Sequence, residues 1–236
     1  MIKNIKTGNE SLSDYSNQAV ENIIETTKSL IEKTGRDFEK FPGKYLTESD
    51  ARCFLYYNMM TCDIDNSEPH IARNNLNTDN PFNRLSRTKD EDVSKSIPLH
   101  TEIRWYGNEG RLKYRSDMVI IEVPDLRTDT AMSLPLPSKG FGFNKFNAII
   151  EIKLRRVNGE TDAEFMKKIK LDVKKLIEIE NHVKGAVDLE YASFIFILDK
   201  KNRNGSMDNS INDIFFGNGE EYKPDRDLLI CYFGSR

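Results

Sequence analysis

The sequence predicts a mixed α/β fold in which one β-sheet is flanked by helices. Two amphipathic helical stretches come first, and three strand-like segments follow them. A long helical stretch then separates the third strand-like segment from a fourth one, which is uninterruptedly apolar. A helix between two strands is typical of a crossover that joins parallel strands, whereas strands joined by a tight turn pair antiparallel. We therefore expect a sheet that contains both kinds of pairing.

Length and composition indicate one domain with a substantial core. The chain has 236 residues, of which 38% are hydrophobic, and we expect a single domain over 1–236 with an N-terminal helical region over 1–46. The formal net charge is −3, but 35 Lys and Arg residues leave room for a local basic surface. Charge therefore neither supports nor excludes a nucleic-acid partner. No apolar stretch approaches the roughly 18 residues of a membrane span, and the N-terminus shows no signal-peptide pattern. We expect a soluble, cytoplasmic protein without membrane contact.

The cysteines indicate neither a disulfide nor a zinc site. There are three of them, and none stand at C-x-x-C spacing. Cys53 and Cys231 lie in apolar runs, so we expect buried, reduced thiols.

Two helices are expected in the N-terminal part of the chain. Apolar residues recur at helical spacing over 12–34, and Gly35 is a plausible stop. The second helix begins after Thr47, whose hydroxyl can cap it. Glu48 stands in line with the apolar positions of this helix, which makes it a candidate site residue. The alternative is a first-turn acid that only favours the helix dipole.

Two long stretches lack a regular pattern. Residues 63–98 are polar and rich in Asn, Asp, Arg and Ser, and residues 124–145 contain several prolines and glycines. Connections of this length inside one domain are either functional or disordered. We expect loop excursions with room for recognition elements.

Residues 99–123 read as two strands joined by a turn near 108–110. In the first strand, His100, Glu102 and Arg104 are expected to share one face. In the second strand, Asp117 comes just as the pattern turns apolar, at the edge of a core.

The next strand, FNAIIEIKLRR, carries charge where aliphatic residues are expected. Ile150, Ile152 and Leu154 fall on one face, whereas Glu151 and Lys153 share the other. Two opposite charges beside a core are costly to desolvate unless they pair or hold an ion. The pair is therefore a candidate site, and the alternative is an edge strand whose polar face lies in water.

The clearest helix is expected over 161–183, and a strand covered on both faces follows over 193–200. Lys168, Asp172 and Lys175 lie along one side of that helix, either toward the site or as a ladder of surface ion pairs. A short helix near 211–216 and a last strand over 227–233 complete the pattern.

This ordered set resembles the PD-(D/E)XK nuclease superfamily, which has the restriction-endonuclease-like fold. The resemblance covers about residues 45–200 and consists of a helical glutamate, an aspartate ending a hairpin strand, and an E-x-K motif on the next strand. These are Glu48, Asp117, Glu151 and Lys153. One departure is that Asp117 follows Ser116, where the family motif has proline. The fold implied is a restriction-endonuclease-like mixed β-sheet core flanked by helices.

The resemblance implies a role for each motif residue. Asp117 and Glu151 match the metal-binding acids, Lys153 matches the motif lysine, and Glu48 matches a helical glutamate beside the metal. A hard cation such as Mg²⁺ prefers oxygen ligands, so these acids and the Ile152 carbonyl suit it, with Mn²⁺ as a substitute. Lys153 could orient the attacking water or stabilise the charge that develops on the phosphate.

Further residues are accessory candidates. Lys168, Asp172 and Lys175 resemble polar residues that family members carry on the helix after the motif. Arg155 and Arg156 follow the motif and could contact phosphates, the alternative being a basic strand end. The remaining accessory candidates are Glu102, as an outer carboxylate, and His100.

The expected function is Mg²⁺-dependent hydrolysis of phosphodiester bonds in nucleic acid, with DNA as the first substrate. The resemblance implies 5′-phosphate ends, and the two excursions favour an endonuclease of the restriction or defence type. One active site per chain favours a homodimer if both strands of a duplex are cut. Two alternatives stay open: a nuclease-fold module that binds nucleic acid or protein without catalysis, and an RNA-directed nuclease. No P-loop, nucleophile elbow or H-E-x-x-H motif indicates another chemistry.

Overall fold

The computed structural model describes most of the predicted elements. The described residues are 2–5, 14–62, 80–87, 95–106, 112–123, 146–183, 191–201, 207, 211 and 228–235. The predicted excursion over 124–145, the turn near 108–110 and all but Ile211 of the expected short helix lie outside them.

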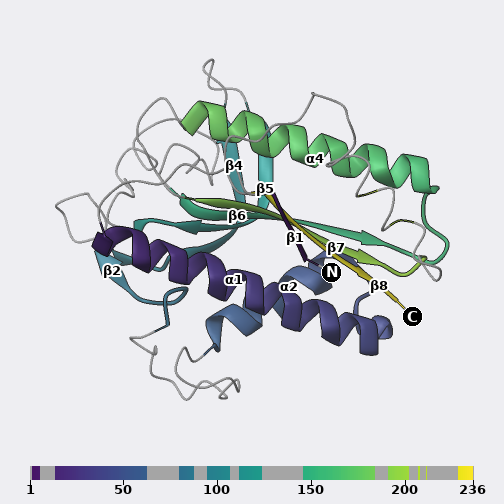
Figure 1. Ribbon diagram of the computed structural model, residues 1–236, viewed down its shortest axis with the longest axis horizontal. Helices are drawn as coiled ribbons and strands as arrows, with labels where there is room; N and C mark the ends of the chain where they lie inside the picture. Colours follow the sequence, from purple (N-terminus) through teal and green to yellow (C-terminus); the bar gives the residue numbers. More distant parts are fainter. Residues whose placement is uncertain are drawn as a thin grey trace.

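Six strands form one mixed sheet in the order β1-β8-β7-β6-β5-β4 (Figure 1). Strands β4, β5 and β6 pair antiparallel, β6, β7 and β8 pair parallel, and β1 pairs antiparallel with β8. The predicted combination of antiparallel and parallel pairing is therefore confirmed, whereas β1 was not predicted. The bounds are Ile2–Ile5 for β1, Leu99–Tyr106 for β4, Leu112–Ile121 for β5, Phe146–Arg155 for β6, Ala192–Asp199 for β7 and Leu228–Gly234 for β8.

A separate ladder of two short strands, β2 (Ser86–Arg87) and β3 (Lys95–Ser96), lies within the predicted 63–98 excursion. Part of that excursion is thus ordered by backbone pairing.

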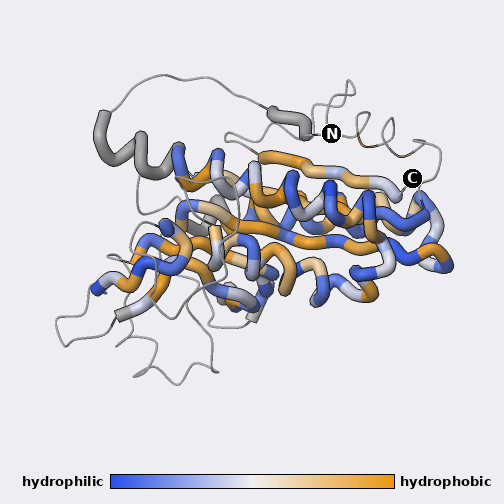
Figure 2. The backbone as a smooth tube through the Cα atoms, turned by 90° about the horizontal axis from the view of Figure 1, so that it is seen from below, coloured by the Kyte–Doolittle hydropathy of each residue, from blue (hydrophilic) through white to orange (hydrophobic). Residues whose placement is uncertain are grey.

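Helices cover both faces of the six-stranded sheet (Figure 1). Helices α1 (Asp14–Lys40) and α2 (Glu48–Met60), joined through the short helix η1 (Pro42–Lys44), pack on one face, and α4 (Asp162–Val183) packs on the other. Along the helix tubes, hydrophilic and hydrophobic colours alternate, as expected for helices with one buried side (Figure 2). No helix in the described ranges is both long and apolar enough to cross a membrane.

Helix α1 continues through Gly35, so the predicted stop at this residue is wrong. A Cβ atom at Gly35 would lie 2.3 Å from a ring carbon of Phe233. The glycine therefore allows α1 to lie directly on the aromatic ring from β8, and close packing rather than helix termination explains its presence.

Helix α2 begins where the sequence predicts. The Thr47 hydroxyl accepts a hydrogen bond from Asp50 N at 3.2 Å, and Asp50 Oδ2 accepts one from Thr47 N at 2.8 Å, which completes a capping box. Ala51, Leu55 and Met59 form the buried stripe. The start and rotation of this helix are therefore fixed by local hydrogen bonds together with burial.

Strand β6 divides its side chains between the two helical layers as predicted. Ile150, Ile152 and Leu154 join the apolar cluster under α1 and α2. Glu151 and Lys153 instead reach the charged residues of α4. All of β7 is buried, which confirms the strand covered on both faces.

The cysteines follow the predicted pattern only in part. All three are free thiols, and Cys231 on β8 is buried. Cys53 is exposed, contrary to expectation, because the buried stripe of α2 runs through Ala51 and Leu55 and leaves Cys53 on the other side.

Candidate functional site

The candidate site lies where β5 and β6 stop pairing. Their antiparallel ladder ends at the pair Met118 and Ile150, and the next pair outward in the same register is Asp117 and Glu151. Instead of a backbone carbonyl of β5, the Asp117 side chain takes the next N–H of β6: Ile152 N donates to Asp117 Oδ2 at 2.8 Å. The two acids therefore face each other across the start of a gap between the strands.

Strand β4 adds a third acid to this row. Thr101 pairs with Met118 and Ile103 pairs with Ser116, which places Glu102 opposite Asp117. Glu102 has a φ of 60°, a conformation uncommon for a residue other than glycine. The regular alternation of β4 changes here, since Leu99 belongs to the α1–α2 cluster and Ile103 to the α4 cluster.

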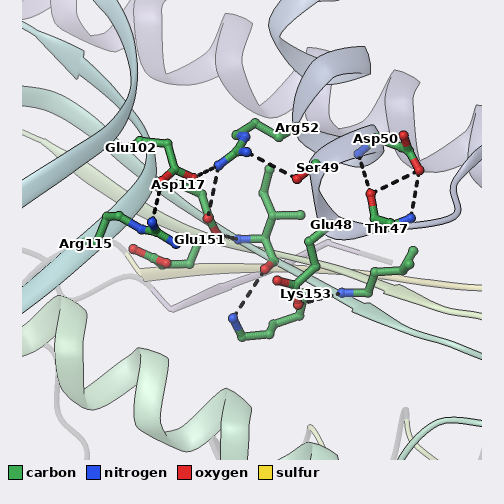
Figure 3. Close-up of polar contacts among 12 residues, drawn as sticks. Thr47, Glu48, Ser49, Asp50, Arg52, Glu102, Arg115, Asp117, Glu151 and Lys153 are labelled. Atoms are coloured by element: carbon green, nitrogen blue, oxygen red, sulfur yellow. Dashed lines mark hydrogen bonds and ion pairs between the residues drawn. The ribbon is translucent and has the colours of Figure 1, made fainter.

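The unusual backbone at Glu102 corrects one prediction. His100, Glu102 and Arg104 do not share one face, because strict alternation fails where φ becomes positive. Glu102, Asp117 and Glu151 instead form a row of carboxylates across three neighbouring strands (Figure 3).

Helix α2 delivers Glu48 to the same gap. Leu154 N donates to Glu48 Oε1 at 3.4 Å. Leu154 lies two residues along β6 from Ile152, whose N–H donates to Asp117. Figure 3 shows Glu48 beside Lys153, and the Glu48 side chain is exposed. Two carboxylates from different elements thus take the backbone N–H groups that β5 leaves free.

Glu151 carries the most perturbed carboxyl group of the site. It is 1% exposed, and its Oε2 accepts a hydrogen bond from Lys175 Nζ. Burial raises the pKa of Glu151 to about 8, opposed by the Lys175 ammonium and reinforced by the Asp117 and Asp172 carboxylates. Its other oxygen, Oε1, is buried without a hydrogen-bond partner among the described residues. Such an oxygen is costly unless a cation or proton occupies it.

Lys153 is held as a charged donor. Its Nζ lies 2.9 Å from Asp172 Oδ2 and 3.4 Å from the Ile152 carbonyl. Burial alone would lower the pKa of Lys153, but the Asp172 and Glu48 carboxylates raise it above its ordinary value. The ammonium therefore stays protonated at neutral pH and can stabilise negative charge, whereas it cannot act as a base.

Two of the three polar α4 residues predicted beside the site are found there. Asp172 binds Lys153 and lies 3.6 Å from Lys175 Nζ, and Lys175 also donates to the Arg115 carbonyl at 3.1 Å. Lys168 is exposed and pairs with Glu160 at 2.8 Å. The helix thus contributes a chain of alternating charges that ends on Glu151.

Two arginines of the site were not predicted from the sequence. Arg52 of α2 pairs with Glu102 and lies 3.9 Å from Asp117 Oδ1, and Arg115 of β5 lies 2.8 Å from the other oxygen of Glu102 (Figure 3). A signal for Arg52 was present, because it stands four residues after Glu48 and shares its side of the helix. Arg115 had no comparable signal.

The donor set fits a hard divalent cation. Asp117 Oδ1, Glu151 Oε1 and the Ile152 carbonyl offer oxygen only, which Mg²⁺ and Mn²⁺ favour. The N–H and C=O of one strand residue point to the same side, so the Ile152 carbonyl shares the gap with Asp117. Within the described residues no three His, Cys, Asp or Glu side chains are close enough together to hold an ion. The fit therefore rests on two carboxylates and a carbonyl, and Mg²⁺ commonly keeps several waters.

The prediction that Arg155 contacts a phosphate is wrong. Its side chain is 1% exposed and pairs with Asp199, which is fully buried, and with Asp162. The guanidinium also lies over the Phe165 ring. Arg155 is therefore a buried structural cation, whereas Arg156 is exposed directly after β6.

His100 lies on β4 with a partner of its own. Its Nε2 lies 3.3 Å from Ser96 Oγ on β3, and burial lowers the pKa of His100. This contact connects the small ladder to the main sheet.

The resemblance to a nuclease superfamily rests on the motif residues named in the sequence analysis. Comparisons with protein-family models, with curated proteins and with solved structures find no match to this chain.

Proposed function

We propose that this protein is a metal-dependent nuclease of the PD-(D/E)XK type that hydrolyses phosphodiester bonds in DNA. One observation carries the proposal: Asp117 and Glu151 face each other where β5 and β6 stop pairing, and Lys153 lies beside them. One oxygen of Glu151 is buried there and has no hydrogen-bond donor among the described residues. An acid with a raised pKa, such as Glu151, beside a fixed cation is characteristic of a reaction site.

The position of each residue indicates its role in the proposed reaction. Asp117, Glu151 and the Ile152 carbonyl would hold the cation. This cation would be Mg²⁺, for which Mn²⁺ can substitute. When bound, the cation offsets negative charge on the phosphate and favours attack by water. Lys153, kept protonated by Asp172, donates to a phosphate oxygen as charge develops. Glu48, which is exposed beside Lys153, orients a water by accepting its hydrogen bond.

The finer assignment is an endonuclease of the restriction or defence type that leaves 5′-phosphate ends. The excursions over 63–98 and 124–145 supply room for recognition elements. A homodimer would present one site to each strand of a duplex. Sedimentation with and without duplex DNA tests the dimer independently of cleavage.

The test is a set of digests with the full chain. Plasmid, duplex and single-stranded DNA, and matching RNAs are incubated with Mg²⁺, with Mn²⁺ and with EDTA. We expect DNA cleavage only with the metal, and a loss of about 10²–10³-fold in rate for Lys153→Ala, as for removal of a charge-stabilising donor. Circular dichroism checks that the variant is folded. Undiminished cleavage by Lys153→Ala, or cleavage in EDTA, contradicts the proposal, and preferential RNA cleavage changes its substrate.

A second candidate function is binding of nucleic acid without catalysis. The observation that favours it is that Lys153 and Glu151 already have partners on α4, Asp172 and Lys175, as a structural ion-pair network requires. Calorimetric titration with Mn²⁺ separates the two functions. A nuclease site binds Mn²⁺ and loses that binding in Asp117→Asn, whereas a structural network gives no such difference.

A further inference from the structure

Arg52 lies across two acids of the site. Its guanidinium pairs with Glu102, its Nη1 lies 3.9 Å from Asp117 Oδ1, and its Nη2 donates to Ser49 Oγ at 3.3 Å (Figure 3). The Arg52 side chain is 21% exposed, so a ligand in solution can reach it.

The two oxygens of Asp117 have different partners. Oδ2 accepts a hydrogen bond from Ile152 N, which fixes the carboxylate against β6. Oδ1 faces the guanidinium of Arg52 and is the oxygen left for a cation. Two positive groups at one carboxylate oxygen repel each other, so Arg52 and a divalent cation oppose each other there.

Glu102 gives Arg52 a second anchor. Its carboxylate pairs with both Arg52 and Arg115, and the register of β4 with β5 places it opposite Asp117. Arg52 can therefore leave Asp117 and still keep an anionic partner. A guanidinium held on one edge retains N–H donors on its other edge, and their planar geometry suits phosphate oxygens.

We propose that Arg52 is a substrate-binding residue that Asp117 and Glu102 hold until a divalent cation takes Asp117. On binding of the cation, Arg52 stays anchored on Glu102 and turns its free N–H groups to a phosphate of the nucleic acid. This proposal rests on the proposed nuclease function. According to this proposal, binding of the cation at Asp117 and binding of a phosphate by Arg52 depend on each other.

The first test is metal affinity without substrate. Mn²⁺ is titrated calorimetrically into wild-type protein, Arg52→Met and Arg115→Met. The first variant removes the guanidinium at Asp117, and the second removes an arginine that pairs with the same glutamate. We expect Arg52→Met to bind Mn²⁺ about two- to fivefold more tightly than wild type, the range for one partly exposed ion pair. Arg115→Met should change the affinity less. Equal or weaker Mn²⁺ binding by Arg52→Met overturns the proposal.

The second test measures nucleic-acid binding in a Lys153→Ala background, in which cleavage is expected to be about 10²–10³-fold slower. Fluorescence anisotropy follows a labelled DNA duplex with Mn²⁺ and with EDTA. We expect Arg52→Met to weaken binding severalfold with Mn²⁺ and to change it little in EDTA. An equal effect in both conditions, or none in either, overturns the proposal.

The Asp117→Asn variant separates this proposal from the nuclease function. If Asp117→Asn retains full Mn²⁺ binding, the metal site and the proposed function fail together. If Asp117→Asn loses Mn²⁺ while Arg52→Met binds it no more tightly than wild type, only the role of Arg52 fails.

Discussion

Asp117 and Glu151 occupy facing positions on β5 and β6, yet they are held from opposite layers of the molecule. Asp117 is fixed by a β6 backbone N–H and approached by Arg52 from α2, whereas Glu151 is bound by Lys175 from α4. The two acids therefore meet at the sheet while their supporting cations come from different helices.

Glu151 should make the metal-free protein less stable as pH rises. Its pKa is about 8 in the folded protein against an ordinary 4.5, so between these values the folded state holds a proton that the unfolded state has released. The contribution of Glu151 to the free energy of unfolding is therefore largest below pH 4.5. Between pH 4.5 and 8 this contribution falls by up to about 1.4 kcal/mol per pH unit, and above pH 8 it no longer changes. Urea unfolding of wild type and Glu151→Gln in EDTA across this range measures it. The variant should lose part of the pH dependence, and parallel curves would contradict the assignment.

Asp172 should control Lys153 without contacting substrate. In Asp172→Asn, Lys153 loses its 2.9 Å partner and the main carboxylate that raises its pKa. We expect slower cleavage with a loss smaller than that of Lys153→Ala, together with a downward shift of the alkaline limb of the pH–rate profile. Lys168→Ala is the matched control on α4, since Lys168 pairs only with Glu160 among the contacts described above. A pH profile unchanged in Asp172→Asn would remove this positioning role.

Gly35 should resist substitution because of Phe233. Alanine places a Cβ atom 2.3 Å from the ring, and such overpacking costs about 1–3 kcal/mol, more than the roughly 0.5–1 kcal/mol that alanine gains in a helix. Urea unfolding of Gly35→Ala should therefore show a net loss of stability.

Gly43→Ala is the control for this prediction, because nothing lies within 4 Å of its Cβ position. Its free energy of unfolding should change by less than about 0.5 kcal/mol. Adding Phe233→Leu to Gly35→Ala should remove part of the penalty. If the losses of stability caused by Gly35→Ala and by Phe233→Leu instead add in full in the double variant, steric contact between the new Cβ atom and the Phe233 ring is not the cause.

Replacement of Arg155 should destabilise the protein far more than replacement of its neighbour Arg156. Arg155→Met removes the guanidinium that pairs with the buried Asp199 and should cost about 3–5 kcal/mol, whereas Arg156→Met removes an exposed cation and should cost almost nothing. Thermal unfolding of both variants measures this difference. Equal stability of the two would contradict the structural role of Arg155.

The sequence predicted most of the sheet because its strands have strong local patterns. The alternation of β6 and the apolar run of β7 indicate their burial directly. Strand β1 was missed because four residues at the chain start carry little pattern, and only their pairing with β8 makes them a strand. The extent of α1 was also missed, since the reason for Gly35 lies on β8.

The site was predictable to the extent that local spacing determines it. Glu151 and Lys153 follow from one strand, and Glu48 follows from one helix. Helical spacing could not distinguish Lys175, which reaches Glu151, from Lys168, which pairs with Glu160 at the surface. The pairing of Arg52 with Glu102 depends on a backbone conformation that no sequence pattern shows.

The ion pairs from α4 have a further consequence for the proposed activity when the protein is heated. Asp172 and Lys175 hold Lys153 and Glu151 from a single helix, while the ladder of β4 and β5 is formed by backbone pairing between the two strands, in addition to the bond from Lys175 to the Arg115 carbonyl. Partial detachment of α4 on warming would release Lys153 and Glu151 at once, while the backbone pairing of β4 with β5 could persist. The proposed nuclease activity should then disappear at a lower temperature than the far-ultraviolet signal of the strands.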